Sequence, residues 1–88
     1  MAWHIEFSRT AERQIRKLSR QAQADITAYL RERVQPAESA RQFGKMLHGD
    51  KQGLWRYRVG DYRLICDVRD ADRTVEVLAI GHRKDVYR

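Results

Sequence analysis

The 88-residue sequence is poor in the residues that secreted, membrane-spanning and multidomain proteins rely on. Its single cysteine, Cys66, excludes an internal disulfide bond and favours a reducing compartment such as the cytoplasm. One proline and five glycines are too few for a flexible linker, so we expect one domain over residues 1–88. Residues 1–7 are too short and polar for a signal peptide, and no apolar run approaches the roughly 20 residues of a membrane span. We therefore expect a cytoplasmic protein with no membrane partner.

Carboxylates are also in the minority. The chain has 18 Lys and Arg against 12 Asp and Glu, which gives a formal net charge of +6 and a pI of about 10.0. This excess favours an anionic partner and contains no information about the fold. Phosphate-binding and dinucleotide-binding glycine motifs are missing, and the histidines (His4, His48 and His82) are not paired at metal-ligand spacing. We expect neither a metal ion nor a cofactor.

The first half of the sequence predicts one strand and two helices. Residues 2–7 alternate between apolar and polar side chains, as a strand with one buried face does. Ser8 and Ser19 each precede a segment with helical spacing of apolar residues, so both are expected to cap helices. Pro36 ends the second helix or opens a short turn over residues 37–43. Two amphipathic helices joined so closely form an antiparallel hairpin.

The second half predicts strands. Residues 54–59 and 62–68 alternate in polarity and are separated by the turn residues Gly60 and Asp61. A polar loop at residues 70–72 precedes a last strand over residues 74–80, which is rich in β-branched residues. The predicted class is α+β, with the order β-α-α-β-β-β and the helical hairpin packed on one face of a small, mostly antiparallel sheet.

The central hairpin carries the most informative pattern. A two-residue loop at 60–61 makes Val59 face Tyr62 and Arg58 face Arg63, and this register fixes which side chains share a face. One face carries the residues expected to pack on the helices, including the thiol: Trp55, Tyr57, Tyr62, Leu64 and Cys66. The other face carries Arg56, Arg58, Arg63 and Ile65, with Asp67 farther along.

The arginines on this second face repel each other. Two arginines directly opposite, Arg58 and Arg63, cost a few tenths of a kcal/mol or more relative to a neutral pair. The arrangement is explained if an anion bridges them, and a phosphodiester is the obvious one because Arg offers planar, forked donors to phosphate. A solvated basic face that binds nothing in particular is the alternative.

Three sequence blocks resemble a known family. The blocks are Leu47-His48-Gly49, Trp55 through Ile65 (WRYRVGDYRLI) and Gly81 through Tyr87 (GHRKDVY). Together with the element order, they resemble the RelE toxins of the RelE/ParE superfamily of toxin–antitoxin toxins, over essentially the whole chain. The middle block is shared across the superfamily, and the Arg-and-Tyr ending is more typical of the RelE branch.

The resemblance implies an endoribonuclease that enters the ribosomal A site and cuts messenger RNA. The 2′-hydroxyl attacks the adjacent phosphorus and leaves a 2′,3′-cyclic phosphate and a 5′-hydroxyl, without a metal. By analogy Tyr87 is the general base or a base-stacking platform, Arg83 serves the leaving 5′-oxygen, and Arg63 binds the scissile phosphate with Arg56 and Arg58. Tyr and Arg have ordinary pKa values near ~10 and above ~12, so electrostatic stabilisation is expected to carry most of the rate.

Several further residues are candidates, and the chain departs from the family pattern in places. Lys45, His48 and Lys84 are candidate RNA- or phosphate-binding residues, and His82 is a possible acid or base. Arg56 and Arg58 stand where the family commonly has lysines, and an arginine does not readily give up a proton.

The resemblance also implies partners and leaves an alternative function open. The expected partners are a RelB-like antitoxin, the ribosome with its messenger RNA, and operator DNA only through the antitoxin complex. We expect an acidic amphipathic segment of the antitoxin to cover the arginine face or to displace the C-terminal tail. A ParE-like toxin that inhibits DNA gyrase without RNA cleavage is the main alternative, and a non-catalytic co-repressor is another.

Overall fold

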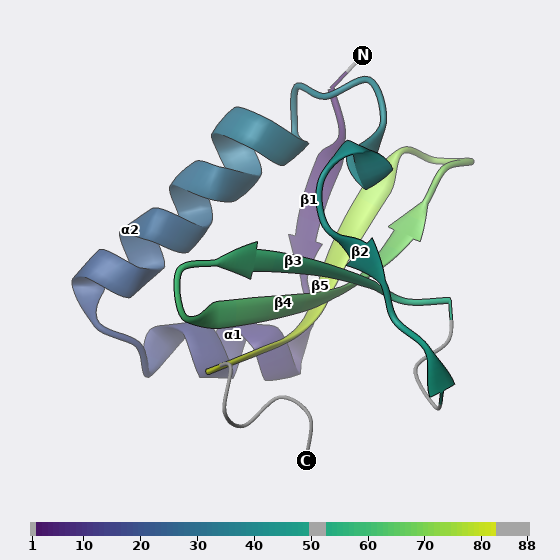
Figure 1. The fold of residues 1–88 in the computed structure, drawn as a ribbon. Helices are drawn as coiled ribbons and strands as arrows, with labels where there is room; N and C mark the ends of the chain where they lie inside the picture. The colour runs from purple at the N-terminus through teal and green to yellow at the C-terminus, as the bar shows by residue number, and fades with distance from the viewer. Residues whose placement is uncertain (1, 50–52, 83–88) are drawn as a thin grey trace.

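The computed structural model describes residues 2–49 and 53–82, which form one mixed sheet with two α-helices on one face (Figure 1). The strand order is β1-β5-β4-β3-β2, with β1 parallel to β5 and the other neighbouring pairs antiparallel. The elements are β1 (His4–Phe7), α1 (Arg9–Arg16), α2 (Arg20–Tyr29), a π-helical turn η1 (Leu30–Val34), a 3-10 turn η2 (Ala40–Gln42), β2 (Lys45–Met46), β3 (Trp55–Val59), β4 (Tyr62–Arg69) and β5 (Thr74–His82). The predicted α+β class and element order are confirmed, and the short β2 is an addition.

Both helices begin where the sequence predicts. The hydroxyl of Ser8 accepts a hydrogen bond from the backbone N–H of Ala11, and that of Ser19 accepts one from Ala22. These side chains satisfy backbone donors that have no partner inside a helix. The first turn of α1 also carries Glu12, whose charge suits the positive end of the helix dipole.

The core lies between the helices and the sheet. It is built from the apolar face of each element, and its largest fully buried side chains are Trp3, Tyr57, Ile26, Leu64, Val34, Val75, Val77 and Cys66. The apolar stripe predicted for the second helix continues through η1, where Leu30 and Val34 are buried. Within the described residues, no helix is both long and apolar enough to cross a membrane.

The hairpin of β3 and β4 has the predicted register. Val59 pairs with Tyr62 and Arg58 with Arg63, and Gly60 takes a positive φ of 59° in the turn between them. A positive φ costs glycine little, which lets two residues close the hairpin. The last strand extends two residues beyond the prediction, to His82.

A β-bulge interrupts β5, and the sequence pattern did not indicate it. Ile65 of β4 pairs with Ala79, whereas the next residue, Cys66, pairs with Val77, so Leu78 is the extra residue on β5. The first helix holds this irregular backbone in place. The hydroxyl of Ser8 donates to the carbonyl of Leu78 at 2.8 Å, and the side-chain oxygen of Gln14 accepts from the N–H of Ile80 at 2.6 Å. The bulge reverses which residues of β5 face the helices.

Candidate nucleic-acid interface

A basic surface lies on the outer face of the sheet, which is the face away from the helices. Strand register brings four cationic side chains together there: Lys45, Arg56, Arg58 and Arg63. Lys45 on β2 pairs with Arg56 on β3, and Arg58 pairs with Arg63 across the hairpin. Paired residues project to the same side of a sheet, so three neighbouring strands contribute to this surface. We call these four residues the basic surface.

The side chains of the basic surface differ in exposure. Lys45 and Arg58 are exposed, whereas Arg56 and Arg63 are half-buried. The Nε of Arg58 donates to the carbonyl of Gly60 at 3.3 Å, which keeps this arginine near the hairpin turn. Half-buried guanidinium groups are screened less by salt than exposed ones, so the centre of this surface attracts anions more strongly than its rim.

Gly44 explains why β2 can approach β3 and bring Lys45 beside Arg56. Its φ is 83°, and a Cβ atom placed on it would lie 2.3 Å from the carbonyl oxygen of Arg56 and 2.6 Å from Nε1 of Trp55. A side chain at this position would therefore force the two segments apart. This glycine is therefore required for the edge of the basic surface.

Side chains on the inner face of β3 fix this strand to the preceding segment. The hydroxyl of Tyr57 donates to the carbonyl of Ala40 at 2.5 Å, and Nε1 of Trp55 donates to the carbonyl of Phe43 at 2.6 Å. Tyr57 is fully buried. Along β3, Trp55 and Tyr57 thus anchor the strand on the helix face of the sheet, while Arg56 and Arg58 project from the outer face. These anchors hold the backbone of the two arginines rigidly.

An acidic cluster lies at the other end of the same outer face. Four carboxylates surround the guanidinium of Arg69 at N–O distances of 3.2–3.6 Å: Glu6, Asp67, Asp72 and Glu76. The hydrogen bonds that Arg69 donates to Glu76 and Asp67 raise the pKa of its guanidinium above the ordinary value. With one cation and four anions, this cluster is net negative. Phosphate is therefore attracted to the β2–β3–β4 end of the sheet and repelled from the β1 end.

His82 lies on the other side of the sheet from the arginines. It pairs with Tyr62, and the two rings meet edge to face with centroids 5.7 Å apart. Arg63 instead has Gly81 as its partner on β5. This arrangement follows from the bulge at Leu78, because alternation without it would put His82 on the outer face.

The other predicted site residues lie after β2 and in the C-terminal segment. His48 is exposed in the segment that follows β2. Arg83, Lys84 and Tyr87 lie outside the described residues, so their roles stay predictions. Among residues 2–49 and 53–82, no group of three or more His, Cys, Asp or Glu side chains could hold a metal ion.

Burial raises the pKa values of one thiol and two phenols that pack in or against the core. Burial raises the pKa of the Cys66 thiol well above its ordinary value, and Asp67 adds to this effect. Desolvation also raises the pKa of Tyr57 strongly and that of Tyr29 to a smaller extent. A protonated, buried thiol is a poor nucleophile, which agrees with the structural role predicted for Cys66.

Comparisons with known proteins give a consistent set of relatives. The family model described as the ParE toxin of the type II toxin–antitoxin system, parDE, matches residues 5–87. Toxin RelG of Mycobacterium tuberculosis is 30% identical over 88 residues, covering 100% of this chain and 99% of the relative. The RelBE2 toxin–antitoxin complex from the same organism contains a chain that superposes with a TM-score of 0.85 at 26% identity, over 94% of this chain and 100% of that one. The isolated Escherichia coli RelE toxin has the same fold, with a TM-score of 0.71 at 20% identity over 92% of this chain and 84% of that one.

Proposed function

Because the chain belongs to the ParE toxin family of type II toxin–antitoxin systems, within the RelE/ParE superfamily, we propose that it is a ribosome-dependent endoribonuclease that cuts messenger RNA in the cytoplasm. The observation that carries the proposal is the basic surface, where Arg58 and Arg63 stand directly opposite each other. Like charges held opposite one another destabilise a sheet, and a bound polyanion would offset this repulsion by pairing with both arginines.

The proposed reaction is an internal transfer of the phosphoryl group. The 2′-oxygen of one nucleotide attacks the adjacent phosphorus and loses its proton to a base. The bond from phosphorus to the 5′-oxygen breaks, and that oxygen gains a proton. The products are a 2′,3′-cyclic phosphate and a 5′-hydroxyl end. The transition state concentrates negative charge on the phosphoryl oxygens, which is where fixed cations lower the barrier most.

The residues of the basic surface fit the charge-stabilising role. Arg63 is proposed to bind the phosphoryl oxygens at the scissile bond, with Arg56 and Arg58 beside it on β3. Lys45 extends the surface along the RNA, as His48 does in the segment that follows. An arginine keeps its proton at neutral pH, so these groups act as charge and hydrogen-bond donors rather than as bases.

The proton transfers are assigned to the C-terminal segment. Tyr87 is proposed as the general base or as a platform for a base, and Arg83 as the group that stabilises the leaving oxygen, with Lys84 as a further phosphate contact. We do not assign His82 to proton transfer, because its ring lies against Tyr62 on the helix face. A positive field at Tyr87 would favour its ionised form, and the ribosome is expected to orient the substrate.

Primer extension on messenger RNA after induction of the protein tests the proposal. We expect cuts in register with codons, abolished by Arg63→Ala and strongly reduced by Tyr87→Phe. Arg33→Gln, at an exposed arginine of η1 that is not part of the basic surface, is the matched control and should leave the cuts intact. Growth arrest without messenger cleavage would contradict the proposal.

Inhibition of DNA gyrase is the second candidate, favoured by the description of the matching family model as a ParE toxin. Gyrase-dependent DNA breaks without RNA cuts would identify this function. The two candidates are separated by adding purified chain to a gyrase supercoiling assay and to a translation extract in parallel.

A RelB-like antitoxin is the proposed partner in either case. Structural relatives include toxin–antitoxin complexes, such as the RelE–RelB complex from Pyrococcus horikoshii. We propose that an acidic, amphipathic segment of the antitoxin covers the basic surface or displaces the C-terminal tail, and that the complex is what binds operator DNA. A complex in which the basic surface stays open to solvent, with the tail in place, would argue against this.

A further inference from the structure

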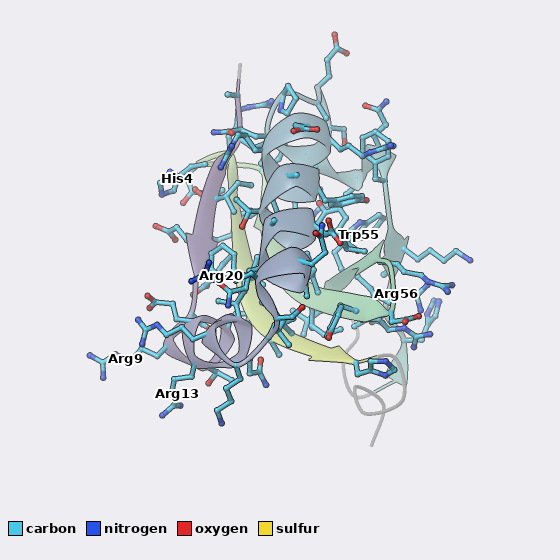
Figure 2. The ribbon with its side chains drawn as sticks, turned by 90° about the vertical axis from the view of Figure 1, so that its left-hand side faces the viewer. His4, Arg9, Arg13, Arg20, Trp55 and Arg56 are labelled. Carbon is cyan, nitrogen blue, oxygen red and sulfur yellow. The ribbon has the colours of Figure 1, made fainter. Side chains whose placement is uncertain are left out.

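A second basic surface lies on α1 and the start of α2, in the helical layer. Its cations are Arg9, Arg13, Arg16, Lys17 and Arg20, all exposed, and we call this set the α1 ridge. One carboxylate, Glu12, lies within it and contacts Arg16 at 3.7 Å. Figure 2 shows Arg9 and Arg13 at the opposite side of the molecule from Arg56. The α1 ridge is thus separate from the basic surface of the sheet.

We propose that the α1 ridge binds the phosphate backbone of double-helical RNA while the sheet binds the single-stranded messenger. This proposal rests on the proposed endoribonuclease function, and it adds a second RNA contact that positions the protein on a structured RNA.

The charges of the ridge stand where they oppose folding. Arg9 is the first residue of α1 and Arg20 is the first residue of α2, where the positive end of each helix dipole disfavours a cation. Arg9 and Arg13 are also four residues apart on one helix, a spacing at which like charges repel. Arg13 and Arg16 lie in the last turn, where the dipole favours them. Acidic residues at the helix starts would make the protein equally soluble and would also suit the helix dipoles. Solubility therefore does not explain the excess of cations, which points to a bound anion.

The ridge is rigid, which suits a rigid partner. The Ser8 cap and Gln14 fasten α1 to the bulge of β5 through hydrogen bonds of 2.8 and 2.6 Å. From Arg9 to Arg16 the helix rises by about 10 Å, so its cations form a fixed row. Arg9, Glu12, Arg13 and Arg16 line a shallow hollow in this row.

The residue types of the ridge favour a double helix over a single strand. Residues 8–20 contain no aromatic side chain on which an exposed base could stack. A double-helical RNA keeps its bases inside and offers its phosphates and 2′-hydroxyls, which cations and polar side chains bind. With the messenger on the sheet and a duplex on the ridge, two weak RNA contacts would reinforce each other.

The test measures binding of an RNA hairpin to the purified full chain by fluorescence anisotropy across a range of salt concentrations. The ridge variant is Arg9→Gln with Arg13→Gln. The matched control is Arg31→Gln with Arg33→Gln, which removes the same charge from the exposed face of η1, at the far end of α2. Gln has nearly the helix propensity of Arg, so both variants should fold.

We expect the ridge variant to bind the hairpin at least tenfold more weakly, with a salt dependence shallower by about two phosphate contacts. The control should bind within twofold of the unmodified chain. Equal losses in both variants would overturn the proposal, because they would show diffuse attraction to net charge. Equal, ridge-dependent binding of a duplex DNA of the same sequence would also overturn it.

Failure of this proposal is distinguishable from failure of the proposed function. If ribosomal messenger cleavage occurs and the ridge variant binds the hairpin normally, the ridge proposal fails and the nuclease stands. If the unmodified chain cuts no messenger but binds the hairpin through the ridge, the nuclease fails and the ridge contact stands.

Discussion

Replacing Arg58 with Gln should affect stability and activity in different ways, because the structure gives this residue opposing energetic roles. Arg58 stands directly opposite Arg63 in the β3–β4 hairpin, and its Nε donates a long hydrogen bond of 3.3 Å to the carbonyl of Gly60. Removing a directly opposed like charge gains about 0.2–1 kcal/mol, and losing an exposed hydrogen bond costs a similar amount. The free energy of unfolding should change by less than about 0.5 kcal/mol, and the melting temperature by less than about 4 °C.

Activity should fall clearly in the same variant. A hydrogen bond from a charged donor contributes about 1.5–3 kcal/mol, and each 1.36 kcal/mol is a factor of ten in rate, so we expect cleavage to slow by roughly 10- to 150-fold. The assay is single-turnover cleavage of messenger on programmed ribosomes, with thermal unfolding followed by circular dichroism on the same protein. Arg33→Gln, which removes one exposed charge elsewhere, is the control.

A double-mutant cycle sharpens the prediction. If repulsion between Arg58 and Arg63 costs stability, the first substitution relieves it and the second adds no further gain, so the two stability effects should not be additive. Cleavage at the wild-type rate by Arg58→Gln would refute the assignment of this residue to phosphate. A fall of more than about 5 °C in melting temperature would refute the claim that its charge opposes folding.

Three further predictions concern the framework that holds the basic surface. Tyr57→Phe leaves the carbonyl of Ala40 without its buried donor, so the free energy of unfolding should fall by about 1–3 kcal/mol in urea titrations. Gly44→Ala should lower stability by more than about 2 kcal/mol because its Cβ would clash with the β3 backbone, whereas Gly53→Ala, also at a positive φ but in open space, should cost less. Stability should fall as the pH rises above about 9, because the thiol of Cys66 ionises in the unfolded chain while burial raises its pKa in the folded chain. The free energy of unfolding should then fall with a slope that approaches about 1.4 kcal/mol per pH unit. Denaturant titrations from pH 8.5 to 10 measure this slope, and Cys66→Ala should flatten it. A pH dependence that is unchanged in Cys66→Ala would assign it to other groups.

Local pattern was enough to predict much of this fold. The caps at Ser8 and Ser19 depend on side chains within three residues of the helix start, and polarity alternation with the turn at Gly60 sets the register of the hairpin. For the same reason the pairing of Arg58 with Arg63 followed from counting outward from the turn. These features are determined by neighbours in sequence, and tertiary contacts did not override them.

The bulge on β5 could not be predicted from local sequence pattern. Counting from Val75 and Val77, which are buried, simple alternation would put Gly81 on the helix face and His82 on the arginine face. The extra residue at Leu78 reverses this, and it is held by hydrogen bonds from Ser8 and Gln14, which are more than 60 residues away in sequence. No local propensity encodes such a contact.

The amino-acid sequence by itself determined the class of fold, the helix starts and the face on which the hairpin arginines gather, because each depends on periodicity and short-range hydrogen bonding. Three features were decided only by the tertiary structure. Lys45 lies beside Arg56 because the backbones approach closely at Gly44, and an acidic cluster forms around Arg69 at one end of the sheet. His82 lies on the face of the sheet opposite the arginines. These arrangements depend on distant segments meeting, and pairing between distant segments is fixed only when the chain packs.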